Sequence, residues 1–159
     1  MNKIVMATLI IATFATSSAF AGLYVGAEGG YATTDTQHTS TKVFAGLQII
    51  PNVGLEAAYS DFGAYRGSTA TAISFAVVGT LPLGDTWDLF AEWGTTHNQT
   101  SYMGTAGNTD ILTGFGLAYN ASKNVSLRLE TENYGKLPTD ANGVSTTVSN
   151  WGVSLKFMF

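Results

Sequence analysis

After residue 22, apolar residues alternate with small or polar residues in eight separate segments of the chain. In WDLFAEWG, for example, Trp87, Leu89 and Trp93 take one set of positions, while Asp88 and Glu92 take the other. A period of two is typical of a β-strand whose two faces meet different surroundings. The sequence therefore predicts an all-β fold with eight strands, within residues 23–31, 42–50, 53–60, 72–83, 87–94, 110–119, 125–133 and 150–159.

The two faces of these segments differ in charge as well as in hydropathy. Every strand charge falls on one face, and glycine is frequent on that same face, as at Gly26, Gly46 and Gly116. A soluble barrel would turn this face to water, but only 11% of the chain is charged, so the exterior would be poor in charge and rich in bare glycine. The opposite arrangement fits better, with apolar side chains towards lipid and small and charged residues inside a narrow lumen.

Composition excludes several other classes of protein. No stretch after residue 15 is apolar for the roughly 20 positions that a membrane helix needs. The absence of cysteine excludes disulfide scaffolds, thiol catalysis and thiolate zinc sites. A net charge of −4 argues against nucleic acid as a partner, because nucleic acid requires clustered Lys and Arg.

Residues 1–21 have the pattern of a secretory signal peptide. Lys3 supplies the positive start, a short apolar run follows, and Ala19 and Ala21 place small residues at the two positions that signal peptidase requires. We expect cleavage after Ala21, which leaves residues 22–159 as the mature barrel domain. The pattern indicates export in a Gram-negative bacterium, to the cell outer membrane.

The connections between the strand segments alternate between short and long. Three are short, at residues 50–52, 83–86 and 120–124, and four are longer and polar, at about 33–41, 61–70, 95–108 and 134–147. Outer-membrane barrels have short periplasmic turns and longer extracellular loops. The sequence therefore predicts an eight-stranded, antiparallel, up-and-down transmembrane β-barrel, with aromatic residues near both rims.

Several segments resemble the OmpA-like transmembrane domain and the related opacity-type outer-membrane proteins. LYVGAEGGY is similar to the first strand of that family, GLQIIPNVGLEAAY to its second hairpin, and GLAYNASKNVSLRLE to its penultimate hairpin. The resemblance covers residues 22–159 and implies a monomeric barrel in contact with outer-membrane lipid and lipopolysaccharide. It also implies that the outer-membrane assembly machinery reads the terminal Phe159. At two inner positions where the family has basic residues, this chain has Val78 and Glu92.

Ten charged side chains are expected inside the barrel. They are Glu28, Lys42, Glu56, Asp88, Glu92, Asp110, Arg128, Glu130, Glu132 and Lys156. Buried charges are costly unless they are paired or hydrated. We therefore expect Arg128 to pair with Glu56 across the lumen, and Lys156 to pair with Glu130 or Glu28.

Two functions remain open for such a lumen. Because the interior of an eight-stranded barrel is just wide enough for side chains, the charges could simply fill it, which favours a structural or surface-interaction protein. Alternatively, a net negative, ion-paired lumen could form a narrow, cation-preferring, porin-like pore. Bound cofactors, metal ions and catalysis are not expected. His38 and His97 are predicted to lie in separate outer loops, where an unidentified surface ligand could also bind.

Overall fold

The structure is a computed structural model that describes residues 22–34, 37–65, 68–101, 105–138 and 145–159. It consists of eight strands and confirms the predicted number. They are β1 (Leu23–Thr33), β2 (Gln37–Ile50), β3 (Val53–Tyr65), β4 (Ser68–Pro82), β5 (Trp87–Ser101), β6 (Thr105–Asn120), β7 (Val125–Pro138) and β8 (Ser145–Met158). The predicted signal peptide, residues 1–21, lies outside the described residues.

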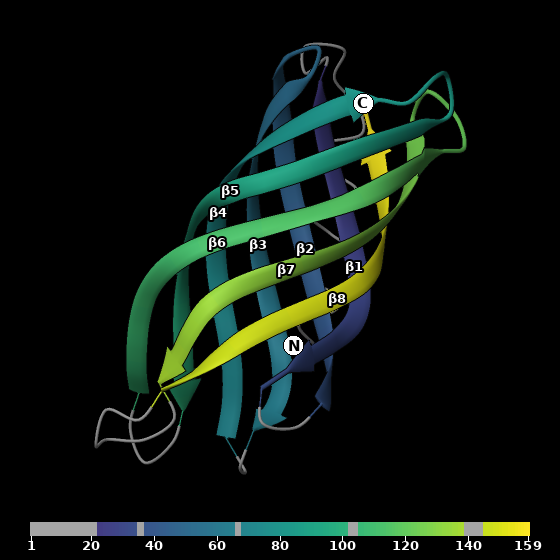
Figure 1. The fold of residues 1–159 in the computed structure, drawn as a ribbon. Helices are drawn as coiled ribbons and strands as arrows, with labels where there is room; N and C mark the ends of the chain where they lie inside the picture. Colours follow the sequence, from purple (N-terminus) through teal and green to yellow (C-terminus); the bar gives the residue numbers. More distant parts are fainter. Residues whose placement is uncertain (1–21, 35–36, 66–67, 102–104, 139–144) are drawn as a thin grey trace.

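The strands form one closed antiparallel barrel in which each strand pairs with its sequence neighbours. The barrel closes where β1 pairs with β8, from Tyr24 opposite Met158 to Thr33 opposite Ser149. The strands are inclined to the barrel axis, as Figure 1 shows. Because the barrel closes, every strand has a neighbour on both sides, which is the condition for placing strands in a lipid environment. The predicted up-and-down antiparallel barrel is therefore confirmed.

The two ends of the barrel differ in their connections. At one end, here called the turn end, residues 51–52, 83–86 and 121–124 form three tight turns. The chain termini of the barrel meet there, since Phe159 N donates to Leu23 O at 2.9 Å. The turn at 83–86 is closed by a bond of 2.7 Å from Leu83 N to Trp87 O. The opposite end, where the other four connections lie, is called the loop end.

A belt of exposed apolar side chains surrounds the barrel. The most exposed members are aromatic, with Trp93 at 66%, Phe115 at 63% and Phe75 at 61%. Aromatic pairs mark the edges of the belt: Trp87 and Tyr119 lie 5.1 Å apart near the turn end, and Tyr31 and Trp151 lie 5.2 Å apart towards the loop end. The apolar face therefore points outward, as expected for strands in contact with lipid. The described residues include no helix long and apolar enough to cross a bilayer.

The strands extend further towards the loop end than the sequence predicted. Residues 37–41, 95–101 and 134–138, expected in loops, belong to β2, β5 and β7. Most of the four long connections are therefore strand, and the prediction of long loops is wrong. Residues 37–41 and 95–101 are rich in Thr, which favours extended backbone, and all three segments continue the ladder with a neighbouring strand. Strands of 13–16 residues exceed the roughly 9–11 that cross a bilayer.

Towards the loop end, polar residues face outward beyond the belt, and apolar residues that begin at the level of the belt face inward. The outward residues, which we call the collar, are Thr33, Gln37, Thr39, His97, Gln99, Thr109, Thr147 and Ser149. The inward residues, which we call the plug, are Ala32, Phe62, Ala70, Ala72, Ala76, Leu112, Tyr134, Leu137 and Val148. Apart from Ala76, no plug residue is more than 2% exposed. The sequence assigned apolar residues to the outer face and did not predict this plug.

Candidate functional site

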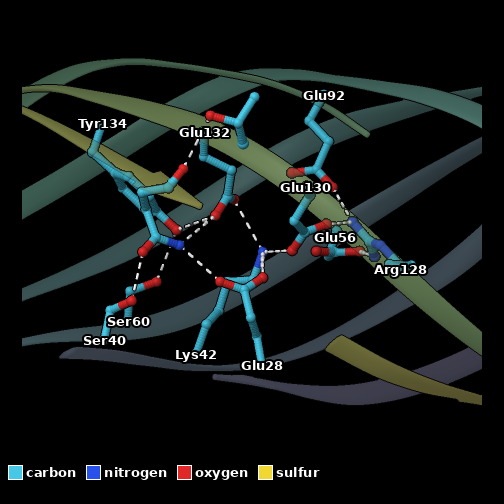
Figure 2. A network of polar contacts seen from close by, with 12 residues as sticks. Glu28, Ser40, Lys42, Glu56, Ser60, Glu92, Arg128, Glu130, Glu132 and Tyr134 are labelled. Atoms are coloured by element: carbon cyan, nitrogen blue, oxygen red, sulfur yellow. Dashed lines mark hydrogen bonds and ion pairs between the residues drawn. The ribbon is translucent and has the colours of Figure 1, made fainter. Parts of the chain in front are cut away.

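The charged residues meet inside the barrel because strand geometry places alternate side chains on the same face. In the segment RLETE, residues 128, 130 and 132 all point into the lumen, which gives β7 three inward charges in a row. Lys42 reaches the same region because it is the cross-strand partner of Glu28. Figure 2 shows the resulting network, in which Glu130 lies between two cations.

The first part of the network surrounds Arg128. Its Nη1 lies 3.0 Å from Glu56 Oε2, which is the cross-lumen ion pair expected from the sequence. Its Nη2 lies 2.5 Å from Glu130 Oε2 and also contacts Glu92. All four side chains are no more than 3% exposed. Arg128 therefore joins β3, β5 and β7 across the lumen.

The second part of the network surrounds Lys42. Its Nζ lies 3.2 Å from Glu28 and 3.1 Å from Glu132, and it also contacts Glu130. The expectation that Lys156 pairs with Glu130 or Glu28 is wrong. Lys42 lies directly opposite Glu28 in the β1–β2 register. Lys156 lies closer to the turn end, with its Nζ 5.2 Å from the centre of the Tyr24 ring.

Aromatic residues, which sequence reasoning missed, support Arg128 from the turn end. The guanidinium carbon lies 4.8 Å from the centre of the Phe44 ring and 4.3 Å from that of Phe90. A cation at these distances from an aromatic face is stabilised electrostatically. A signal for these residues exists in the sequence, because Tyr24, Phe44 and Phe90 occupy polar-face positions.

Each of these inward aromatic residues has a glycine as its cross-strand partner. The pairs are Phe44 with Gly26, Tyr24 with Gly46, and Phe90 with Gly116. A Cβ at any of the three glycines would overlap the partner's ring. The glycines on the inner face therefore provide the space in which the aromatic rings lie across neighbouring strands.

A neutral polar layer connects the ions to the plug. Ser40 Oγ donates to Asn150 Oδ1 at 2.5 Å, and Asn150 Nδ2 donates to Glu28 Oε1 at 2.7 Å. The Tyr134 hydroxyl donates to Glu132 Oε2 at 2.9 Å and lies 2.9 Å from Ser60 Oγ. On its other side, the Tyr134 ring lies 4.8 Å from the Phe62 ring of the plug. Ions, polar groups and apolar side chains thus follow one another towards the loop end.

Two acids predicted in the lumen lie outside this network. Asp88 accepts a hydrogen bond of 2.8 Å from Asn120 Nδ2 near the turn end. Asp110 accepts bonds from the backbone amides of Ile111 at 2.8 Å and Lys136 at 2.9 Å, near the loop end. Asp110 therefore supports the backbone of β6 and β7 and is not a lumen ion.

The three carboxylates around Lys42 are the candidate metal ligands among the described residues. One oxygen from each of Glu28, Glu130 and Glu132 lies within 4.8 Å of the others. The Lys42 ammonium contacts all three and supplies the positive charge that a metal ion would bring. The cluster is therefore better described as an ion-paired support of the barrel interior.

The two histidines lie in strands, so their predicted loop placement is wrong. His38 belongs to β2 and His97 to β5. His97 faces outward, and its Nδ1 lies 2.9 Å from Thr109 Oγ1 on the neighbouring strand. Its ring forms no ion pair with a carboxylate of the described residues. In hydrolytic enzymes with a nucleophile and a histidine base, a third group of this kind orients the histidine.

Several solved β-barrel structures share this fold. Neisserial surface protein A matches with a TM-score of 0.66 and 16% identity, over 87% of this chain and 98% of that chain. The N-terminal β-barrel domain of Pseudomonas aeruginosa OprF matches with a TM-score of 0.62 and 14% identity, over 86% and 97%. The outer membrane enzyme PagL matches with a TM-score of 0.60 and 13% identity, over 86% and 99%. No curated protein matches the sequence.

The sequence itself agrees with this fold. The OmpA-like transmembrane domain matches residues 15–158, which include all eight strands, the belt and the lumen network. The chain therefore belongs to the family of OmpA-like transmembrane domains, as a small eight-stranded outer-membrane β-barrel.

Proposed function

We propose that this barrel is a structural and surface-interaction protein, closed to transport, that presents its loop end at the cell surface and performs no catalysis. The observation that carries the proposal is the filling of the lumen. Two ion clusters, a polar layer and the plug follow one another along the axis, and their side chains are almost completely buried. A water-filled path through these layers would require several of them to separate together.

The collar supports a role at the surface. Beyond the belt, polar side chains face outward while the plug packs inside, so the barrel continues as a packed body outside the apolar region. A rigid support of this kind holds loops in fixed positions, as binding loops require. In the outer membrane, the belt meets lipid, and the collar lies at the level of lipopolysaccharide. An unidentified surface ligand would bind at the loop end.

The orientation follows from how far the strands extend past the belt. At the turn end three tight turns follow the belt directly, as is typical of the periplasmic end, whereas at the other end the strands continue into the collar. Phe159 lies at the turn end, bonded to Leu23, where the outer-membrane assembly machinery would meet it in the periplasm.

Orientation is tested by cysteine labelling, which the absence of native cysteine makes specific. Gln99→Cys in the collar and Asp85→Cys in a turn are both exposed. On intact cells, we expect a membrane-impermeant maleimide to modify Gln99→Cys. Asp85→Cys should react only after the outer membrane is permeabilised. The reverse pattern would contradict the proposed orientation.

The alternative function is a narrow pore with a net negative lumen. It is favoured by five buried glutamates that face only two buried cations. Recordings of refolded protein in planar bilayers distinguish the two functions. A closed barrel gives no channel events for the wild type or for Arg128→Ala, because the plug remains in place. Regular, cation-selective events in the wild type would support the pore and reject the closed barrel.

A further inference from the structure

The turn end of the barrel contains a cavity of about 550 Å³, which we call the vestibule. It extends from the turns, at Asn52, Asp85 and Lys123, to Arg128. Small-molecule sites commonly measure about 300–1,000 Å³ and combine apolar walls with a few polar groups. The vestibule therefore has the size of a ligand site, and it lies at the end opposite to the proposed surface display.

Two hydrogen-bond donors at the vestibule lack an acceptor among the described residues. Lys156 lines the cavity, and its Nζ forms no hydrogen bond or ion pair with the described residues but lies 5.2 Å from the centre of the Tyr24 ring. Arg128 also lines the cavity, and its buried Nε has no hydrogen-bond partner, although both terminal nitrogens are bonded to glutamates. Both donors belong to cations, and the strongest hydrogen bonds of a cation are those to a negatively charged acceptor.

The acids deepest in the barrel are already engaged. Glu56 and Glu130 bond to the terminal nitrogens of Arg128, and they do not line the vestibule. The vestibule itself is lined by two acids, Asp85 and Asp88, and by three cations, Lys123, Arg128 and Lys156. An anion from outside the chain would therefore meet an excess of positive charge without displacing an existing ion pair.

One wall of the vestibule is apolar. Val78, Phe90 and Ala118 line it and form a buried cluster of their own. Asn52, Thr80 and Asn120 add neutral polar groups. The best complement to this combination is a molecule with an anionic group at one end and an apolar body.

We propose that the vestibule binds a small organic anion, a carboxylate or phosphate, with its acidic group on Lys156 at the end of the cavity where the Arg128 side chain lies. The apolar body of the ligand packs against Val78 and Phe90. Lys156 is the binding residue that can be tested separately, because Arg128 also holds the lumen network together.

Titration calorimetry on the refolded full barrel tests this site. The detergent must have an uncharged sugar headgroup, so that no headgroup competes as an anion. Benzoate and phenyl phosphate are the carboxylate and phosphate probes, and benzyl alcohol is the neutral control. We expect both anions to bind with dissociation constants on the order of 1 mM or tighter. Benzyl alcohol should bind at least tenfold more weakly.

Matched variants locate the binding. Lys156→Gln should weaken both anions about tenfold or more, whereas Lys156→Arg should retain them because the charge remains. Lys136→Gln makes the same charge change at an exposed position near the loop end and should leave binding unchanged. Gel mobility before and after boiling identifies any variant that fails to fold. If Lys156→Gln fails to fold, the affinity of Lys156→Arg for the two anions tests the role of the positive charge.

Several results would overturn the proposal. They are equal binding of benzyl alcohol and benzoate, equal loss of affinity in Lys136→Gln and Lys156→Gln, or no binding of either anion. Inorganic phosphate that binds as tightly as phenyl phosphate would overturn the role of the apolar wall.

Discussion

At the scale of single residues, Lys42 is the clearest test of the lumen network. Its side chain is 1% exposed and contacts three glutamates. Removal of one partner from a buried ion pair leaves uncompensated charge and commonly costs about 3–5 kcal/mol. Lys42→Met should therefore lower the free energy of unfolding by about 3 kcal/mol, measured by urea titration in detergent micelles.

Two comparisons make this measurement specific to charge. Lys136→Met removes an exposed lysine and should change the free energy of unfolding by less than about 0.5 kcal/mol. The deficit of Lys42→Met should also shrink as the pH falls, since protonation removes the repulsion between Glu28, Glu130 and Glu132. A deficit of equal size at all pH values would indicate lost packing in place of lost charge compensation.

Glycine at position 116 gives a second prediction at this scale. A Cβ there would lie 2.6 Å from Phe90 Cζ and would overlap Leu129 O. Overpacking of this kind costs about 1–3 kcal/mol, so Gly116→Ala should be destabilised by that amount in the same urea assay. Gly79 faces outward and has nothing within 4 Å of an added Cβ, so Gly79→Ala serves as the control. Equal effects at both sites would rule out the close packing of Phe90 on Gly116.

The sequence predicts some of these contacts and not others. The Arg128–Glu56 ion pair could be expected because both residues lie on the charged face at similar depth. The Lys42 cluster could not, because its partners depend on the exact register of β1 with β2 and on which strands meet across the lumen. Lys156 was assigned to the wrong partners for the same reason.

At the scale of strands, the orientation of the two faces can be tested on β7 and β8. Leu129 is 54% exposed and lies within the belt, where β7 pairs with its neighbours at Leu117 and Val153. A lysine near the bilayer midplane costs about 2–4 kcal/mol, whereas one near an interface costs about 0–1 kcal/mol. Leu129→Lys should therefore be destabilised by about 2–4 kcal/mol in lipid bilayers. The outward collar variant Ser149→Lys should be nearly unaffected.

The contrast between Leu129 and Ser149 depends on the position of the membrane. If both variants lose the same free energy in folding titrations into phospholipid vesicles, the collar lies within the hydrocarbon, and the boundary drawn at Tyr31 and Trp151 is wrong.

The number and direction of the strands could be predicted from period-two alternation, but their ends could not. The collar is rich in Thr, Ser and Gln, which are typical both of loops and of strands that face water. Phe62 and Val148 interrupt the rule that apolar residues face lipid, because they fill the barrel beyond the belt. Knowledge of where the strands leave the membrane is needed to distinguish these two uses of apolar residues.

At the scale of the whole molecule, the barrel is open at one end and closed at the other. The vestibule extends from the turn end as far as Arg128, whereas the plug fills the interior towards the loop end. This asymmetry unites the two proposals. The closed end provides a rigid support for surface interaction, and the open end offers a site for a small anion.

The asymmetry can be tested on a single strand. Thr80 and Ala72 both face inward on β4, but Thr80 lines the vestibule and Ala72 lies in the plug, 1% exposed. Because the chain has no cysteine, each position can carry the only thiol. In the folded barrel, we expect a water-soluble maleimide to modify Thr80→Cys readily. Ala72→Cys should react only after unfolding, since a thiol must be accessible to react.

The relative reaction rates of these two variants, followed by mass spectrometry, also decide between a closed barrel and a pore. A continuous aqueous path would expose both positions and give similar rates. A large excess for Thr80→Cys places the barrier between them, at the ion clusters or the plug. Repeating the measurement with Lys42→Met added distinguishes these two barriers. If Ala72→Cys then becomes reactive, the ion network is the barrier; if it stays protected, the plug closes the barrel on its own.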